Sequence, residues 1–239
     1  MFVLVPYHVD VPMRCRPWMN WVVIGLTVVF YPLCISSKGL SPLGEHLMLG
    51  GKSWVGMVGH VLVHADILHL LGNMLFLWVF GNAVCAKVGN LVYPFFYFGL
   101  GFAAGLGAFL LDPRPAVGAS GAINGIVGMF VVWYLLNEIS CWYAYWFFGV
   151  ADAGSYSVSS FWMVLLWLAF DIWGAIRGGG NVGYVAHLAG FTLGVTLGIL
   201  LLVVGWVEME EGERSLLQIV SGAEEARPRA KKRRTSRRP

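Results

Sequence analysis

The chain has 239 residues, of which 58% are hydrophobic and only 12% are charged, and its formal net charge is +3. The mean hydropathy is +0.70. A water-soluble domain of this size does not carry so apolar a composition, so we expect the lipid bilayer to be its solvent.

Six apolar runs are candidates for membrane-spanning helices, since a span needs about 20 mainly apolar residues. In chain order they are Trp18–Ile35, Leu62–Ala86, Leu91–Leu111, Ala119–Leu136, Phe161–Ile176 and Gly183–Val207. The fourth and fifth are short, because at about 1.5 Å per residue they extend less than about 30 Å. One end of each should stop inside the membrane, where protein or water must satisfy its backbone groups. We predict an all-α fold, a polytopic bundle of six transmembrane helices.

The basic residues predict the orientation of this bundle. An even number of spans places both termini on one side, and 12 of the 16 Lys and Arg residues fall on that side. The positive-inside bias then puts both termini in the cytoplasm. The C-terminal tail dominates this count, because without it the balance is three against four. Three regions are expected: a cytoplasmic segment at 1–17, a membrane domain at 18–207 and a disordered basic tail at 208–239.

Two regions outside the spans have distinctive compositions. The loop Asn137–Ser160 contains an aromatic run, Cys141–Phe148, that is too short to cross the membrane. Trp and Tyr favour the headgroup level, so we predict an interfacial segment on the cytoplasmic face. The tail is acidic from Glu208 and later polybasic, a composition typical of disorder. It could attract anionic lipid or serve only to set the topology. No folded nucleic-acid-binding module accompanies it, so no nucleic-acid partner is expected.

Polar residues cluster near the start of the second run: His60, His64, His69 and Asn73. His60 and His64 are four residues apart, as are His69 and Asn73, so the members of each of these two pairs would share one helical face. Two histidines at this spacing suit zinc, but the Glu of His-Glu-x-x-His is missing and no extra carboxylate is well placed. For His60 and His64 we favour hydrogen bonding between helices or capping. His69 and Asn73 lie deeper, and donation to a developing oxyanion is an equal alternative for them.

Ser120 lies in the run Gly118-Ala119-Ser120-Gly121, which opens the fourth apolar segment. A lone Ser in a spanning helix usually packs or bonds to its own backbone. Here Gly118 allows a turn into a helix, which would place Ser120 in the first turn. Free N–H groups point outward there, and the helix dipole favours negative charge. Ser120 is therefore a candidate nucleophile, although Gly-x-Ser alone is a weak signal.

The last run combines a histidine with glycines at four-residue spacing: His187, Gly190, Gly194 and Gly198. Such a stripe permits close approach of another helix. The fourth run offers a matching stripe at Gly121 and Gly125. If the two stripes meet, His187 can face Ser120 and act as a general base. Without that neighbour it would be a structural hydrogen-bonding residue or a proton relay.

Asp171 is the one acidic residue of the fifth run. It could be the third member of a catalytic triad. A cap or an ion pair near the water boundary is the interpretation we favour. The four cysteines show no paired spacing and indicate neither a disulfide framework nor a zinc site.

Together these residues resemble the rhomboid family of intramembrane serine proteases. The matching pattern is His60…His64…His69-x-x-x-Asn73, Gly118-x-Ser120-Gly121 and Ala186-His187-x-x-Gly190-x-x-x-Gly194, on the second, fourth and sixth runs. The likeness extends from about Lys52 to Trp206. Three linked motifs on three separate runs make the resemblance specific.

The resemblance implies a Ser–His dyad, with Ser120 as nucleophile and His187 as general base. It implies an oxyanion hole formed by His69, Asn73 and the Ser120 amide. The supporting residues would be Gly118, Gly121, His60, His64, Asn124, Gly190 and Gly194. The loop Arg177–Gly183 would cap a cavity that opens to the external side.

The implied activity is cleavage of transmembrane-helix substrates near the external membrane boundary, without a cofactor or metal. Single-span membrane proteins and membrane lipids are the expected partners, and the bacterial cytoplasmic (inner) membrane is the expected location. An inactive rhomboid-like protein that binds transmembrane helices is the alternative. A channel or transporter would need discontinuous helices in paired halves, and no such repeat is visible.

Two departures from the family pattern affect the expected site. Many members carry Trp-Arg in the first external loop, where this chain has Trp54-Val55. Some members have an aromatic residue four positions after the nucleophile, stacked on the catalytic imidazole, and this chain has Asn124 there. His187 must then be oriented by another contact, for which a hydrogen bond to Asn124 is a candidate. Ala119 replaces the Pro that marks inactive relatives.

Overall fold

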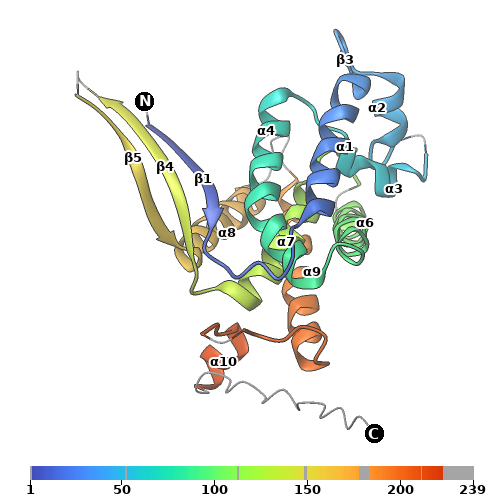
Figure 1. Cartoon of the computed structure of the whole chain (residues 1–239). Helices are drawn as coiled ribbons and strands as arrows, with labels where there is room; N and C mark the ends of the chain where they lie inside the picture. The colour runs from blue at the N-terminus through green and yellow to red at the C-terminus, as the bar shows by residue number, and fades with distance from the viewer. Residues whose placement is uncertain are drawn as a thin grey trace, which may run out of the picture.

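The computed structural model describes residues 2–51, 53–111, 113–147, 150–177, 183–210 and 212–222. A bundle of helices carries a three-stranded sheet on one flank, with β1 beside α4 (Figure 1). The longer helices are α1 (Trp18–Cys34), α4 (Ile67–Phe76), α5 (Asn82–Val88), α6 (Tyr93–Leu111), α7 (Ser120–Tyr134), α8 (Ser160–Arg177) and α9 (Tyr184–Val203). A π-helical turn, η2 (Leu77–Gly81), joins α4 to α5. The short elements are α2 (Pro42–Leu47), α3 (Gly56–Gly59), the 3₁₀ turn η1 (His60–Leu62) and α10 (Leu216–Ser221).

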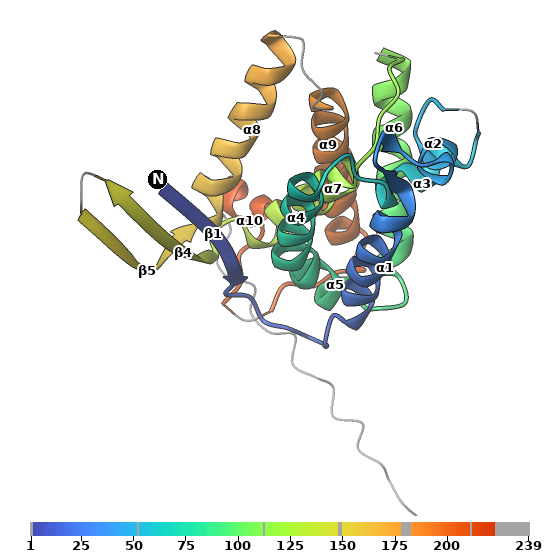
Figure 2. The ribbon, with the colours of Figure 1, turned by 90° about the horizontal axis from the view of Figure 1, so that it is seen from above.

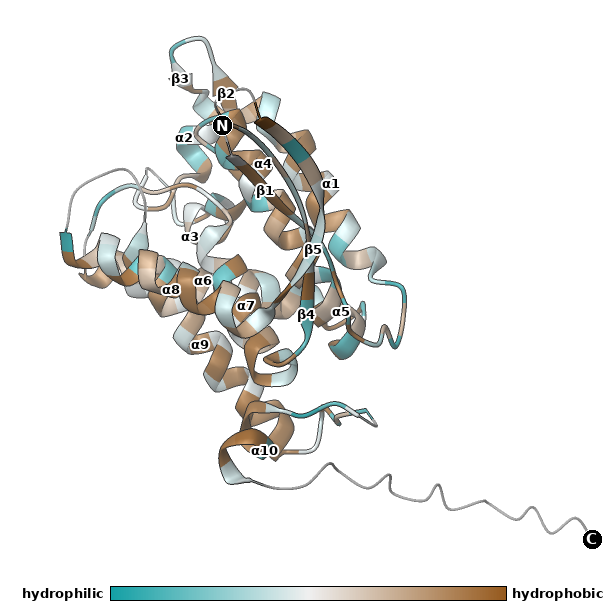
Figure 3. Ribbon diagram, turned by 90° about the vertical axis from the view of Figure 1, so that its left-hand side faces the viewer, coloured by the Kyte–Doolittle hydropathy of each residue, from teal (hydrophilic) through white to brown (hydrophobic). Residues whose placement is uncertain are grey.

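Each of the six apolar runs forms a helix, and the helices are mostly hydrophobic (Figure 3). Four helical segments are long and apolar enough to cross a membrane: Ile67–Val88, Tyr93–Leu111, Ser160–Arg177 and Tyr184–Val203. The fourth run is short, as predicted, since α7 has 15 residues. The fifth is longer than predicted, since α8 has 18 residues and is one of these four segments. The first is shorter than expected at 17 residues.

The second span begins later than the hydropathy indicated. The chain turns through η1, becomes extended at Val63, and enters α4 only at Ile67. Asp66 caps α4, and its side chain accepts a hydrogen bond from the His69 amide at 2.8 Å. The prediction that His60 and His64 share one helical face was therefore wrong.

Helix α7 lies at the centre of the bundle, and every residue from Gly121 to Tyr134 is buried. A helix that is apolar on all sides lies either in a protein core or in contact with lipid, and the burial of α7 shows that protein surrounds it. Its neighbours are η2, α6 and α9. Because α7 starts at Ser120, this central position places Ser120 against the neighbouring helices instead of the lipid.

The glycine stripes of α7 and α9 meet, an arrangement that their matching four-residue spacing permits. A Cβ atom added to Gly190 would collide with the carbonyl oxygen of Gly121, and one added to Gly194 would collide with that of Gly125. Farther along, the Trp133 indole donates to the Gly198 carbonyl at 3.2 Å. The two helices therefore run side by side from their N-terminal turns.

The loop at residues 137–160 forms a β-hairpin, which was not predicted. β4 (Glu138–Phe147) pairs antiparallel with β5 (Val150–Ser159), in register from Glu138↔Ser159 to Phe147↔Val150. β1 (Phe2–Val9) completes the sheet in the order β1-β4-β5. A second, two-residue pairing joins β2 (Ile35–Ser36) and β3 (Gly39–Leu40). The N-terminal segment therefore contributes a strand, which was not predicted.

The tail is not disordered from its first residue. A reciprocal capping box between Ser215 and Gln218 begins α10. Just before it, the Glu213 carboxylate accepts a hydrogen bond from the Lys87 ammonium at 2.6 Å, and both side chains are almost fully buried. The polybasic stretch lies outside the described residues.

Candidate active site

His69 and Asn73 stand one turn apart on α4, as predicted. Asp66 is the N-cap of this helix, and its hydrogen bond to the His69 amide fixes the first turn, in which His69 lies. Asn73 is 8% exposed, and within the described ranges its Nδ2 atom has no hydrogen-bond partner. His69 is partly buried, and its ring lies edge-on to that of His64, with 5.0 Å between the ring centres.

Gly118 brings the segment before Ser120 against these two side chains. Its φ of +123° is a conformation that favours glycine. A Cβ atom there would lie 2.7 Å from His69 Cε1 and 3.9 Å from Asn73 Nδ2. The Gly118 amide donates to the His60 carbonyl at 3.0 Å, which ties this segment to η1. Any side chain at Gly118 would thus displace the His69 ring.

Ser120 is the first residue of α7, as predicted from the preceding glycine. The N-cap residue, Ala119, supplies no side-chain hydrogen bond to the first turn. The amides of that turn lack intrahelical partners, because the first four N–H groups of any helix do. The Ser120 carbonyl accepts from Asn124 Nδ2 at 3.0 Å.

His187 lies in the first turn of α9 and is 8% exposed. Its Nδ1 atom is 2.9 Å from Oδ1 of Asp171 on α8, and Asp171 is 3% exposed. This corrects two expectations. Asp171 is not a helix cap but pairs with a buried histidine, and the hydrogen-bond partner of His187 is Asp171 and not Asn124.

The N-terminal turns of α7 and α9 lie against each other. A Cβ atom at Gly121 would be 3.6 Å from both the Cβ and the carbonyl oxygen of Ala186. Ser120 and His187 are the residues adjacent to this contact. His187 is also close enough to His69 for an electrostatic interaction. Among the described residues, no hydrogen bond joins the Ser120 hydroxyl to His187. Catalytic hydrogen bonds are often long without substrate and tighten on binding.

His60 and His64 lie near these residues, but neither ring forms a hydrogen bond with them in the described part of the chain. His60 Nδ1 lies 3.0 Å from the Gly56 carbonyl, a contact inside its own segment. Neither ring nitrogen of His64 has a partner in the described part of the chain. Burial lowers the pKa of His60, and it lowers the pKa of His64 to about 4. Both rings are thus neutral at pH 7. No group of three metal-ligating side chains is found within the described ranges.

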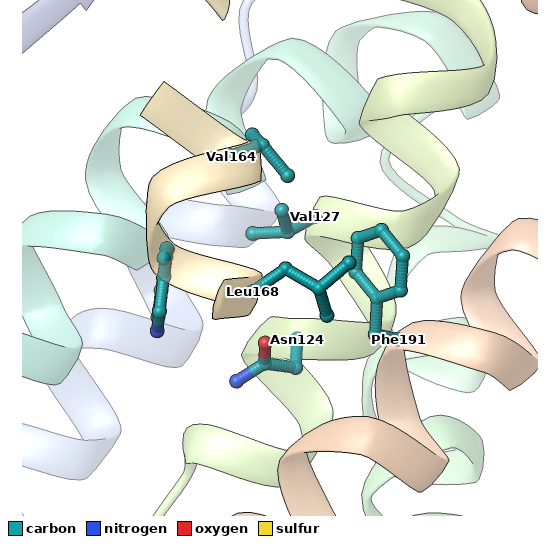
Figure 4. A pocket seen from close by; sticks show the side chains of 6 residues that line it. Asn124, Val127, Val164, Leu168 and Phe191 are labelled. Carbon is teal, nitrogen blue, oxygen red and sulfur yellow. The ribbon is translucent and has the colours of Figure 1, made fainter. Parts of the chain in front are cut away.

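The contact between α8 and α9 supplies residues that the sequence analysis missed. The Tyr184 ring packs directly over Gly174, where a Cβ atom would collide with it. The same ring is 6.1 Å from His187, in an edge-on arrangement. One turn before Asp171, Leu168 faces Asn124 and Phe191 across a gap too narrow for water (Figure 4). The one sequence signal for the contact between α8 and α9 is the three-residue spacing of Asp171 and Gly174, which places both on one face of α8.

Other expected features lie partly outside the described residues. The predicted cap at 177–183 is described only at its two ends. In the loop before η1, the Trp54 side chain is 90% exposed and makes little contact with the rest of the described protein.

Comparison with known proteins identifies the family. The chain is 27% identical to Rhomboid protease GluP of Bacillus subtilis over 131 residues, covering 52% of this chain and 26% of the relative. It is 28% identical to the chloroplastic Rhomboid-like protein 11 of Arabidopsis thaliana over 198 residues, covering 78% and 66%. It is 25% identical to the mitochondrial Rhomboid protein 1 of Saccharomyces cerevisiae over 189 residues, covering 74% and 51%.

The chain spans from about a quarter to two thirds of the length of these relatives. The family model described as Rhomboid domain matches residues 51–204, which is more than half of the chain. That range holds all three motifs and the four helical segments long enough to cross a bilayer. The protein is therefore an integral, multi-pass membrane protein that belongs to the rhomboid family.

Proposed function

We propose that this protein is an intramembrane serine endopeptidase that cleaves transmembrane-helix substrates near the external membrane boundary. One observation carries the proposal: the N-terminal turn of α7, with Ser120, lies against that of α9, with His187, beside His69 and Asn73. The family membership adds support, because relatives of this chain are named as proteases.

The proposed chemistry is acyl transfer. His187 takes the proton of the Ser120 hydroxyl as the oxygen attacks a peptide carbonyl, and later returns it to the leaving amine. A general base of this kind contributes about 10²–10⁴-fold to the rate. Water then hydrolyses the acyl-enzyme, so water must reach the site within the depth of the membrane.

The oxyanion of the tetrahedral intermediate needs donors in place before the reaction. The Asn73 amide is buried and unpaired in the described structure, and Gly118, two residues before Ser120, lies against both His69 and Asn73. Donors that are held without a partner cost no reorganisation when charge develops. One such donor accounts for about 2.7–4 kcal/mol of transition-state stabilisation in measured cases.

The proposed partners are single-span membrane proteins and the surrounding lipid. A substrate helix has its carbonyl groups bonded internally and must unwind before attack. Substrates with Gly, Ala or Pro near the external boundary are therefore expected. Pro interrupts the helical hydrogen bonds and Gly weakens the helix, while the small side chain of Ala leaves the backbone accessible. We further propose that both termini are cytoplasmic, by the positive-inside bias.

The test is cleavage of a model spanning substrate in proteoliposomes. Ser120→Ala and His187→Ala should each lose nearly all activity while keeping the fold. Ser157→Ala and His46→Ala are matched controls at exposed positions of β5 and α2 and should cleave as the wild type does. Full activity in Ser120→Ala would refute the proposal.

The alternative is a rhomboid-like protein that binds transmembrane helices without cutting them. Labelling with a fluorophosphonate separates the two functions, because only an activated serine reacts with it. Labelling that is present in the wild type and lost in Ser120→Ala supports the protease. Substrate binding without labelling or cleavage supports the inactive protein.

A further inference from the structure

We infer that Asp171 is a positioning residue for His187: it holds the imidazole with its proton on Nδ1 and leaves Nε2 free for the Ser120 hydroxyl. This inference rests on the proposed function. It gives the site a third member on a third helix, α8, where the family resemblance implied a dyad only.

The contact itself is short and protected. Oδ1 of Asp171 lies 2.9 Å from Nδ1 of His187, and the side chains are only 5% and 10% exposed. A buried carboxylate is costly unless a hydrogen bond compensates it. Ionisable groups inside a membrane are correspondingly rare and are usually functional. His187 is the hydrogen-bond partner of Asp171 among the described residues and satisfies Oδ1, while Oδ2 is buried without a partner there.

The acceptor determines which ring nitrogen carries the proton. An ionised carboxylate has no proton to donate, so a hydrogen bond to Oδ1 requires a proton on Nδ1. In the neutral imidazole, Nε2 then carries the lone pair that a general base needs. When Ser120 attacks, its proton passes to Nε2, and the resulting imidazolium stays paired with the Asp171 carboxylate. That proton later passes to the leaving amine, and no proton moves to Asp171.

The position of Asp171 on α8 fits this role better than that of a terminal cap. Asp171 lies six residues before the end of the helix at Arg177. Val164, Leu168, Asp171 and Gly174 recur at helical spacing and face the α7–α9 pair, while Phe170 and Ile172 are exposed. The carboxylate is therefore in the packed stripe, not at the solvent boundary.

Gly174 and Tyr184 set the distance between α8 and α9. The Tyr184 ring occupies the space that a Gly174 side chain would fill, one turn beyond Asp171. Figure 2 shows α8 beside α9 at the margin of the bundle. Close packing at this point keeps Oδ1 within reach of Nδ1, and no other contact in the described residues orients the ring by hydrogen bonding.

The experiment compares Asp171→Asn with the wild type in the full-length protein. Asn has the same shape, but its amide can donate to Nδ1 and select the other tautomer. Asp152→Asn is the matched control, because Asp152 also accepts a hydrogen bond, from the Tyr143 hydroxyl at 2.9 Å, on exposed β5. The measured quantities are the thermal midpoint, kcat and KM for a spanning substrate, and the ¹⁵N shifts of the His187 ring, assigned by their loss in His187→Ala.

We expect Asp171→Asn to lower kcat by at least about tenfold with KM little changed. The ¹⁵N spectrum should show a proton on Nδ1 in the wild type and its loss in the variant. A kcat equal to that of the wild type overturns the inference, and so does a lower kcat with the proton still on Nδ1. If the wild type neither cleaves nor labels at Ser120, the proposed protease function fails. The ring spectra would still decide the positioning role of Asp171.

Discussion

The Asn73 side chain is a buried donor with no acceptor in the described structure. Buried polar groups in native proteins are nearly always paired, so an orphan amide needs an explanation. It lies beside Gly118, two residues before the proposed nucleophile. An oxyanion formed at Ser120 would be the missing acceptor, which explains why the amide is held unpaired in the absence of substrate.

Replacing Asn73 by Leu should therefore separate catalysis from stability. The change removes the donor while keeping the approximate volume, so we expect kcat to fall about 10²–10³-fold. The free energy of unfolding should stay the same or rise, because an unsatisfied buried amide is removed. Steady-state cleavage and thermal unfolding in detergent would measure the two effects.

The control for this prediction is Asn82→Leu. Asn82 accepts a hydrogen bond from Asn20 at 2.8 Å and lies in α5, beyond η2 from the site. Its loss should lower stability and leave kcat of the folded fraction nearly unchanged. A wild-type kcat in Asn73→Leu would exclude this side chain from the oxyanion hole.

Single residues also show what sequence reasoning could and could not determine. The placement of Ser120 at a helix start followed from Gly118, a local relation along the chain. The pairing of Asp171 with His187 depends on how two helices face each other, which hydropathy does not encode. From the sequence alone, Asp171 is expected near the water boundary, because it lies close to the end of an apolar run.

At the scale of elements, the contact between α7 and α9 determines the site. The helices touch through backbone at Gly190 and Gly194, where neighbouring carbonyl oxygens occupy the space of a side chain. Membrane helices gain no hydrophobic force for association from lipid, so small residues that allow close packing have a large role. Four-residue spacing made this contact predictable from the sequence.

Gly194→Ala should push the two helices apart. The added methyl group would overlap the Gly125 carbonyl oxygen, a backbone atom that can move only with its helix. We expect a loss of about 1–3 kcal/mol in unfolding free energy, typical of overpacking, together with a severe loss of cleavage. Unfolding by denaturing detergent and substrate cleavage would test both.

Gly99→Ala is the matched control for that substitution. Gly99 lies in α6, and a Cβ atom there would meet nothing within 4 Å. Its activity should equal that of the wild type, and its stability should be unchanged or slightly higher, since Ala favours helix more than Gly. Equal behaviour of the two variants would show that α7 and α9 do not need close contact.

The β-hairpin is the element that sequence reasoning missed. Its aromatic run resembled a headgroup-level segment because Trp and Tyr are frequent there. Only the base of β4 shows clear alternation of buried and exposed residues. Its second neighbour, β1, comes from the opposite end of the chain, with Phe2 opposite Tyr145. Pairing over such a sequence separation leaves no local pattern to detect.

At the scale of the whole molecule, segments near both ends of the described chain are tied to the rest of the fold. β1 pairs with β4, and the segment after α9 returns to α5 through the Lys87–Glu213 ion pair. The Lys87 ammonium also lies 5.2 Å from the centre of the Tyr134 ring, at the end of α7 opposite Ser120. The C-terminal segment thus holds the far end of the helix that carries the proposed nucleophile.

Lys87→Met should therefore destabilise the protein strongly, because it leaves the Glu213 carboxylate buried without its partner. Breaking a buried pair in this way costs about 3–5 kcal/mol. The double variant Lys87→Met with Glu213→Leu should recover most of that loss, since neither charge then remains buried. Unfolding free energies of the two single variants and the double variant, combined in a double-mutant cycle, measure the coupling.

The nearby pair Arg14–Glu210 supplies the contrast for this cycle. Its Nε–Oε1 distance is 2.5 Å, but the side chains are 35% and 42% exposed. Solvent screens such a pair, so Arg14→Met should change the unfolding free energy by no more than about 1 kcal/mol. If Lys87→Met had as small an effect, the C-terminal segment would not fasten α5 and α7. In that case apolar packing alone would hold the α7 end at Tyr134, and Lys87→Met would cleave substrate as fast as the wild type.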